Sequence, residues 1–413
     1  MKEEQNKNQL PEGWKLDKLG NVCVFSQGIQ VDVEKQFHEK ANDRVRFLRI
    51  IDFTQNDEPE RYIQNPGDKY YLAKSEIAMV RYGTVGFVCT GKEGVIANNL
   101  FKIIPEKILD RKYLINFLRS HYFTGQLKTK GATMQALSFG MINPIPIPIA
   151  PFSVQQAIVS KIEELFSDLD KGIETLRLAQ QQLKTYRQSV LKWAFEGRLT
   201  NENVKAGVLP KGWLEVLISS VTEMNPKIPN RENIDNKKEV QFLPMKLVEE
   251  IINKIHLTEI RRYEEVLKGS YTPFINGDVI FAKVTPCMEN GKIAIVDKLK
   301  NGIGFGSSEF HVIRAGSKVI SKFIFYYLVQ DRFRHEAANS MTGAVGLRRV
   351  PKQFIENHTI PLPTIEEQKN IVLQIESRVS VVDKMEENIN QSLQQAEALK
   401  QSILKKAFEG KLI

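Results

Sequence analysis

Two sets of basic and polar residues in this sequence have side chains suited to nucleic-acid recognition. Arginine and lysine pair with the edge of guanine or hold phosphate, and glutamine pairs with adenine. Taken singly, each such residue is more often an ordinary solvated loop charge. As two sets they predict contact with DNA. The candidates are Arg81, Tyr82, Thr84, Lys128, Lys130 and Gln135 in the first set, and Lys283, Thr285, Arg348, Arg349 and Lys352 in the second.

The distribution of charge supports a polyanionic partner such as double-stranded DNA. The chain has 413 residues and a formal net charge of +9. Residues 1–150 contain 21 Lys+Arg against 17 Asp+Glu, and residues 209–363 contain 22 against 17. The positive excess therefore lies in the two segments that carry the candidate residues.

Signals for catalysis, metal binding and membrane insertion are missing from the sequence. It has no GxxxxGK[ST] phosphate loop and no NPP[YF] motif of an amino-methyltransferase, and its six histidines do not have metal-ligand spacing. Its three cysteines lie far apart, which favours reduced thiols in a cytoplasm. No apolar stretch of roughly 20 residues occurs. Because the first residues include no apolar segment, we expect no signal peptide. We expect a cytoplasmic protein with no catalytic residue, no metal and no bound cofactor.

The chain contains a repeated segment whose two copies have the same length. An offset of 213 residues aligns residues 147–199 with residues 360–412 without a gap. Both copies end alike, as LKWAFEGRL at 191–199 and LKKAFEGKL at 404–412. Such self-similarity indicates two copies of one structural plan.

Upstream of this constant part the two halves agree only in outline. LPEGW at 10–14 corresponds to LPKGW at 209–213, an offset of 199. NNLFKII at 98–104 corresponds to SSEFHVI at 307–313, an offset of 209. Because the offsets differ, a variable part and a constant part alternate twice along the chain.

The constant part has the heptad spacing of a coiled coil. Ser153 and Thr364 are predicted to cap two long helices, and Gly197 and Gly410 to end them. Apolar residues seven apart form the predicted seam, namely Ile162, Leu169, Leu176, Leu183 and Val190 in the first copy and Ile375, Val382, Ile389, Ala396 and Ile403 in the second. Gly172, Ala179 and Ser392 are expected to allow the helices a close approach. Two amphipathic helices in separate cores remain the alternative.

The variable parts show short β-type runs such as NVCVFS (21–26) and GDVIFAKV (277–284), separated by turn signals. Each also has one helix-like stretch, near 110–121 and 319–334. If the long helices pair within one chain, connectivity requires them to be antiparallel. We therefore predict an α+β fold in which two globular, mostly β domains are joined by two long antiparallel helices in a coiled coil, with internal pseudo-two-fold symmetry. The expected segments are 1–150, 151–200, 201–360 and 361–413.

Four motifs occur in one order, largely twice over. They are the LPEGW and LPKGW openings, the GDVIF strand with SEIAMV in its place in the first half, the IPIAPFSVQQ and IPLPTIEEQ helix starts, and the AFEGRL and AFEGKL helix ends. In this arrangement the chain resembles the specificity subunit of a type I restriction–modification system, over essentially its whole length.

The resemblance implies a non-catalytic subunit with two target-recognition domains, each reading one half of a bipartite DNA site. It implies that the paired helices set the spacer and dock two methyltransferase subunits, and that a restriction and translocase subunit joins for cleavage. S-adenosylmethionine would then be bound by the methyltransferase partner. Because the two blocks are dissimilar, we expect unlike half-sites and an asymmetric recognition sequence.

Two alternatives stay open at this point. The first is a non-catalytic coiled-coil scaffold whose β-domains bind protein, which would show no salt-dependent affinity for DNA. The second is the recognition subunit of another methyltransferase-based defence system. Co-purification of its partners would distinguish the second from the type I assignment.

Overall fold

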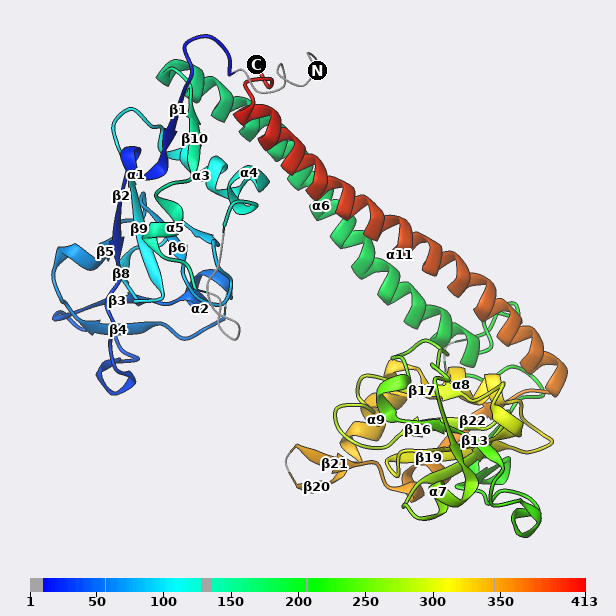
Figure 1. Ribbon diagram of the computed structural model, residues 1–413. Coiled ribbons are helices and arrows are strands. Elements are labelled where there is room, and N and C mark those ends of the chain that lie inside the picture. Colours follow the sequence, from blue (N-terminus) through cyan, green and yellow to red (C-terminus); the bar gives the residue numbers. More distant parts are fainter. Residues whose placement is uncertain (1–9, 56, 128–135, 206, 345) are drawn as a thin grey trace. The chain divides into compact units, whose positions relative to one another are not determined.

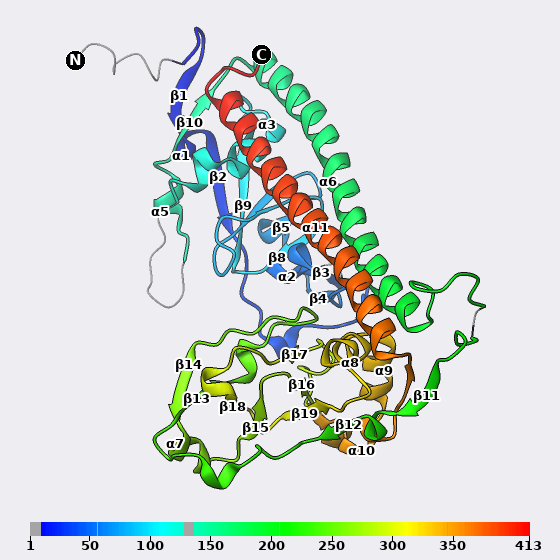
Figure 2. The same ribbon diagram turned by 90° about the vertical axis from the view of Figure 1, so that its right-hand side faces the viewer.

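A computed structural model of the chain describes residues 10–55, 57–127, 136–205, 207–344 and 346–413. The chain forms two compact units, of which unit 1 comprises Met1–Arg177 with Asn390–Ile413 and unit 2 comprises Leu178–Ile389. Two long helices, α6 (Phe152–Phe195) and α11 (Ile365–Phe408), each contribute one part to each unit (Figures 1 and 2). Strands and helices are mixed in both units, so the α+β prediction is confirmed.

Unit 1 is built on two four-stranded sheets and a two-stranded ribbon. One sheet is antiparallel, with the strand order β2 (Cys23–Gln27), β9 (Leu100–Pro105), β6 (Ile77–Val80) and β7 (Val88–Cys89). The other has the order β4 (Arg61–Gln64), β3 (Arg44–Leu48), β8 (Gly94–Ile96) and β5 (Tyr71–Leu72), in which β3 and β8 are parallel. The remaining elements are β1 (Lys15–Lys18) paired with β10 (Pro146–Ile149), and the helices α1 (Leu19–Val22), α2 (Ile50–Thr54), α3 (Arg111–Arg119), α4 (His121–Thr124) and α5 (Phe139–Ile142).

Unit 2 repeats this topology. Its sheets have the orders β12 (Thr222–Met224), β19 (Phe310–Ala315), β16 (Val279–Ala282), β17 (Ile293–Ile295) and β14 (Glu259–Arg262), β13 (Glu239–Leu243), β18 (Ile303–Gly306), β15 (Thr272–Ile275). A ribbon of β11 (Leu214–Leu217) and β22 (Thr359–Leu362) matches the ribbon of unit 1. The remaining elements are the hairpin of β20 (Thr342–Ala344) and β21 (Leu347–Arg349), and the helices α7 (Tyr263–Leu267), α8 (Ser321–Leu328), α9 (Asp331–Asn339) and α10 (Lys352–Glu356).

The register of the sheets corrects one detail of the sequence alignment. Val80 of β6 pairs with Leu100 of β9, and in unit 2 the corresponding Ala282 pairs with Phe310. Leu100 therefore matches Phe310, so the offset here is 210 residues and the expected offset of 209 is wrong by one. The phenylalanine shared by NNLFKII and SSEFHVI made the wrong register look better, although strand pairing decides which residues are equivalent.

The ends of the long helices are part of the globular cores. In unit 1 the ring of Phe408 lies 5.0 Å from the ring of Tyr113 and 5.3 Å from that of Phe117, measured between centroids. In unit 2 the ring of Phe195 lies 4.9 Å from that of Phe323. Each AF pair in the repeated AFEGxL motif thus supplies a buried aromatic anchor, with edge-on ring contacts that add to the burial energy.

The glycine after each anchor explains why LPxGW and AFEGxL occur as a pair. Gly410 has a φ of +68°, and a Cβ placed on it would lie 2.2 Å from Cγ of Pro11 in the first LPxGW motif. Gly197 has a φ of +78° and has the same relation to Pro210 of the second motif. The predicted glycine ends are therefore confirmed, since only glycine fits this left-handed, crowded position.

One buried glutamine fixes the start of each long helix to its globular unit. The Oε1 of Gln155 accepts a hydrogen bond from the backbone of Asp110 at 2.8 Å, and its Nε2 donates to two carbonyl groups. Gln368, at the equivalent position of the repeat, accepts from the backbone of Ile320 at 3.0 Å and also donates to two carbonyl groups. Because both side chains are fully buried and satisfied, they set the helix orientation within each unit.

The two helix starts differ from the prediction in one case. Thr364 precedes α11 and its Oγ1 accepts a hydrogen bond from the backbone of Glu367 at 3.3 Å, so this cap is confirmed. Ser153 is the second residue of α6 rather than its cap, because the helix begins at Phe152, directly after Pro151. A proline before the first turn fixes the backbone there without a side-chain cap.

The helices are antiparallel where they pair. In unit 1 the N-terminal part of α6 lies beside the C-terminal part of α11, with an ion pair between Asp170 and Lys400. In unit 2 the C-terminal part of α6 lies beside the N-terminal part of α11, with Arg187 2.6 Å from Asp383. All ten residues of the predicted seam are buried or half-buried. Gly172 does not provide a close approach, since a Cβ placed on it would have no atom of the described residues within 4 Å.

Candidate nucleic-acid interface

The candidate site of unit 2 begins where β16 ends. Lys283 follows this strand, and its backbone N–H donates to the carbonyl of Glu309 at 2.9 Å. Its own carbonyl accepts from the backbone of Val350 at 2.8 Å. The ammonium group also donates to the carbonyl of Ser308 at 2.8 Å. Lys283 is therefore held in place by the backbone of two neighbouring segments.

Unit 1 has the same frame around a different residue. Arg81 follows β6, and its backbone N–H donates to the carbonyl of Asn99 at 2.9 Å. The carbonyl of Arg81 accepts from the backbone of Leu137 at 3.0 Å, and its guanidinium donates to the carbonyl of Asn98 at 3.3 Å. Arg81 and Lys283 thus occupy equivalent places, as their positions after equivalent strands suggested.

The hairpin of β20 and β21 is bonded to Thr285, a further candidate two residues after Lys283. The Thr285 hydroxyl donates to the carbonyl of Gly346 at 3.2 Å and accepts from the backbone of Arg348 at 3.1 Å. The backbone N–H of Thr285 donates to the carbonyl of Arg348 at 3.1 Å. These bonds fasten one strand of the hairpin to the loop that follows β16.

The two adjacent arginines of this hairpin have different partners. The guanidinium of Arg349 makes a bidentate pair with Glu309, with distances of 2.8 and 2.7 Å. These hydrogen bonds lower the pKa of Glu309, which therefore stays ionised at neutral pH. Arg348 contacts Glu289 through a single nitrogen at 3.4 Å. Arg348 consequently keeps more hydrogen-bonding capacity than Arg349.

The other candidates either lie outside the hydrogen-bonded frame around Arg81 and Lys283 or lie outside the described residues. Lys352 forms its ion pair with Glu356, four residues further along the same helix, α10. Tyr82 bridges to Ala136, and Thr84 lies exposed in the turn after β6. Lys128, Lys130 and Gln135 lie outside the described residues.

A buried polar group beneath the hairpin was missed in the sequence. The Nε2–H of His311 donates to the carbonyl of Val350 at 2.9 Å, and Nδ1 faces the amide nitrogen of Asn225 at 3.4 Å. The amide oxygen of Asn225 accepts from the backbone of Val312, so this side chain connects β19 to the histidine. Burial lowers the pKa of His311, and the ring is neutral at pH 7. No spacing rule indicates such a pair, because its members are 86 residues apart.

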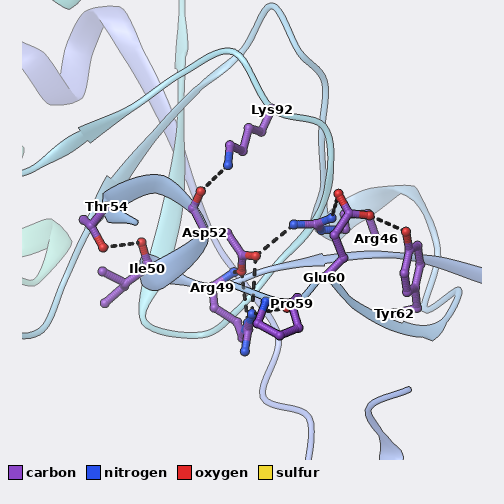
Figure 3. Close-up of polar contacts among 9 residues, drawn as sticks. All are labelled: Arg46, Arg49, Ile50, Asp52, Thr54, Pro59, Glu60, Tyr62 and Lys92. Carbon is purple, nitrogen blue, oxygen red and sulfur yellow. Dashed lines mark hydrogen bonds and ion pairs between the residues drawn. The ribbon is translucent and has the colours of Figure 1, made fainter. Parts of the chain in front are cut away.

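A second missed cluster lies in unit 1 around the buried carboxylate of Asp52 (Figure 3). Arg46 donates to this carboxylate at 2.9 Å, and Arg49 donates its backbone and side-chain N–H groups at 2.8 and 3.0 Å. Arg46 also pairs with Glu60, and Lys92 donates to the backbone carbonyl of Asp52. Most of these donors point inward, so the cluster ties α2 to β3 and serves mainly to hold the fold.

The GDVIF and SEIAMV strands each begin with a carboxylate that pairs with a basic side chain, but the residues differ. Asp278, buried at the start of GDVIF, accepts two hydrogen bonds at 2.8 Å from Arg314. In unit 1 the equivalent residue is Glu76, whose carboxylate lies 3.4 Å from the ammonium of Lys102. Both carboxylates also cap the turn before the strand, accepting from a backbone N–H three residues earlier. SEIAMV is therefore a variant of the motif and keeps its function in the fold.

Groups that could support other chemistry are few in the described ranges. No group of three His, Cys, Asp or Glu residues there could hold a metal ion. The three cysteines are free thiols, and burial raises the pKa of Cys23 and of Cys89 to about 12, so both are protonated. Among the helices so described, none has the length and apolar character needed to cross a membrane.

Comparison with known proteins places this geometry in a family. The profile of the type I restriction modification DNA specificity domain matches residues 11–177 and 210–395. The EcoAI specificity subunit of Escherichia coli is 35% identical over 229 residues, which cover 55% of this chain and 38% of that protein. The StySPI specificity subunit of Salmonella potsdam is 24% identical over 98% of this chain and 91% of that protein. The chain thus matches less than half the length of its EcoAI relative.

Solved structures show the same fold at lower sequence identity. A chain from a study of complex assembly and conformational transition of the type I R-M system superposes with a TM-score of 0.73 at 18% identity, covering 98% of this chain and 100% of that one. The HsdS subunit from Thermoanaerobacter tengcongensis superposes with a TM-score of 0.53 at 19% identity, covering 98% and 99%. Since the family profile matches twice and covers most of the sequence, the chain belongs to the type I restriction–modification DNA specificity family.

Proposed function

We propose that this chain is the sequence-specific DNA-binding subunit of a type I restriction–modification enzyme, with each unit reading one half of a bipartite, asymmetric site. The observation that carries this proposal is the repeated frame around Arg81 and Lys283. The same backbone bonds hold a different basic residue in each unit. A constant frame with different side chains suits two domains that read different bases.

The long helices fit the tasks of setting the spacer and docking methyltransferase subunits. A paired helix is stiff, and 44 residues at about 1.5 Å each give a rod of about 66 Å. In unit 2 both helices carry exposed apolar side chains that the fold does not bury, namely Leu178 and Tyr186 on α6 and Leu373, Val381 and Met385 on α11. Exposed apolar side chains grouped on helices suit a protein partner.

In this proposal the chain supplies recognition and its partners supply chemistry. Two methyltransferase subunits carry S-adenosylmethionine, and a restriction and translocase subunit joins the complex for cleavage in the cytoplasm. The buried carboxylates of Asp52 and Asp278 are both ion-paired with arginine side chains, so neither is free to act as a general base. This supports a non-catalytic role for the chain.

Mapping methylated adenines across the genome, with and without the gene, tests the proposal. We expect a bipartite motif with unlike halves to lose methylation when the gene is deleted, and to regain it on complementation. A perfectly palindromic motif would refute the asymmetry. A scaffold protein would leave methylation unchanged, and its purified form would show no salt-dependent DNA affinity. Co-purification with a different class of partner would support the alternative of another defence system.

A further inference from the structure

The β20–β21 hairpin is the part of unit 2 that its own core does not use. Figure 1 shows it projecting from the rest of that unit. All three residues of β20, Thr342–Ala344, are exposed, and Leu347 of β21 is 52% exposed. One exposed leucine is ordinary on a protein surface, but a ribbon with one strand exposed throughout and no buried residue contributes little to folding. Folding stability alone therefore does not explain why this segment forms a hairpin.

The hairpin is nevertheless firmly anchored at its base. Thr285 binds the strand β21 through its hydroxyl and its backbone, and Arg349 is clamped by Glu309. Val350, directly after the hairpin, is 1% exposed and hydrogen-bonded to both Lys283 and His311. A projecting element with a fixed base is suited to presenting side chains in one orientation.

A glycine lies opposite Arg348 in the ribbon. Gly343 pairs with Arg348 in the register of the hairpin and has a φ of +126°. A Cβ on Gly343 would lie 2.7 Å from the carbonyl oxygen of Leu347. Arg348 therefore has no side-chain neighbour across the ribbon, and its guanidinium has room to approach a ligand.

The dimensions of the hairpin match those of the DNA major groove. This groove is about 12 Å wide and about 8.5 Å deep, and it admits a two-stranded β-ribbon. Leu347 is two residues beyond Arg349, or about 6.6 Å at about 3.3 Å per residue. With Arg349 just outside the rim of the groove, Arg348 and Leu347 both lie within its depth, and room remains for the turn that lies beyond Leu347 in the hairpin.

The charges are arranged in the order that this placement requires. Lys283 and Arg349 lie at the base of the hairpin, the end that would face the phosphates bordering the groove, and Glu309 offsets one of these two positive charges. Further out, β20 and Leu347 carry no charge, which permits close approach to base edges. Arg348 is 43% exposed and uses one nitrogen at 3.4 Å for Glu289, so its other donors are available for a bidentate contact.

We propose that the β20–β21 hairpin enters the major groove of the half-site bound by unit 2, and that Arg348 and Leu347 determine specificity at adjacent base pairs. Arg348 presents two donors to the O6 and N7 acceptors of guanine, and Leu347 packs against the neighbouring pair. This inference rests on the proposed function, because it assigns residues to the reading of one half-site.

A selection experiment tests the inference. The full-length chain, purified with the subunits that accompany it in its host, is incubated with a duplex DNA library randomised across both half-sites, and bound sequences are counted. For R348A we expect about a 10- to 100-fold loss of preference at one base pair of one half-site, with the other half-site unchanged. L347A should weaken preference at a neighbouring pair. R332A, which removes an exposed arginine of the same unit, is the matched control and should leave every preference intact.

The outcomes separate the inference from the proposed function. If wild type selects a bipartite sequence and both hairpin variants select it with unchanged preferences, the hairpin does not read bases and the inference fails alone. If R348A weakens binding equally for all sequences and lowers the salt slope by about one, Arg348 holds a phosphate and the assignment is overturned. If wild type selects no sequence at all, the proposed function fails and the inference with it. R348K, with thermal unfolding of each variant, distinguishes loss of contact from loss of structure.

Discussion

Replacing Phe408 by alanine should destabilise unit 1 although the residue belongs to the last helix of the chain. Phe408 is 1% exposed and lies between the rings of Tyr113 and Phe117. Truncating a fully buried phenylalanine costs about 3–5 kcal/mol, because transfer energy is lost and a cavity is left. The equivalent change in unit 2 is Phe195→Ala, which provides a matched variant.

Hydrogen exchange followed by mass spectrometry measures this effect in each unit separately. If exchange occurs through opening of the whole unit, F408A should speed exchange of peptides from β9 and α3 by about 150- to 5,000-fold. Peptides from β19 and α8 should keep their wild-type rates. F195A should give the reverse pattern.

Two results would contradict this reasoning. Faster exchange limited to the last turn of α11 would mean that Phe408 is dispensable for the core of unit 1. Equal acceleration in both units for either variant would mean that the chain opens as a single cooperative unit. Gly410→Ala is a useful companion, since it strains the same joint through backbone conformation and a clash with Pro11 rather than through lost burial.

Further predictions concern the buried polar groups and the helices. D52N should destabilise unit 1 by about 3–5 kcal/mol in urea unfolding, because two guanidinium groups lose their buried anion, and a change below about 1 kcal/mol would contradict this. Burial lowers the pKa of His311 and of His358, so the stability each neutral ring contributes is present above pH about 6.5 and is lost as pH falls below it. Urea midpoints at pH 7.5 and 5.5 should therefore differ more for wild type than for H311F, and equal differences would exclude His311 as a cause. One heptad inserted into α6 should lengthen the preferred spacer and leave both half-sites unchanged. An unaltered spacer in methylation mapping would contradict the proposal that the helices set the spacer.

Periodic and local features of the fold were predictable from sequence. Heptad spacing located two helices of 44 residues, and glycine located their ends, because these signals arise within a few residues of each other. The sequence prediction was wrong where a second local feature, or a misleading sequence match, competed with the true one. Ser153 was a plausible cap, but Pro151 begins the helix earlier, and the phenylalanine match near residue 100 concealed a register that only strand pairing reveals.

The candidate interface was predictable only in part. Arg81 and Lys283 could be found because each directly follows a recognisable strand. Arg348 could be nominated for its charge, but its difference from Arg349 depends on Glu289 and Glu309, which lie 59 and 40 residues away in sequence. Long-range partners of this kind leave no spacing rule to detect.

Under the proposed function, the comparison of the two units indicates how the DNA target could change while the fold is kept. The frame around the candidate site consists of backbone hydrogen bonds, which any residue except proline can make at the position of Arg81 or Lys283. The residue beneath the frame also differs, since His311 takes the place of Phe101, yet the strand pairing is the same. The half-buried Arg81 and Lys283 side chains add only bonds to nearby carbonyl groups, so the fold depends on their identity less than on the fully buried glutamines Gln155 and Gln368. Divergence should accumulate at the first kind of position and be excluded from the second, which is the pattern that two unlike readers on one scaffold require.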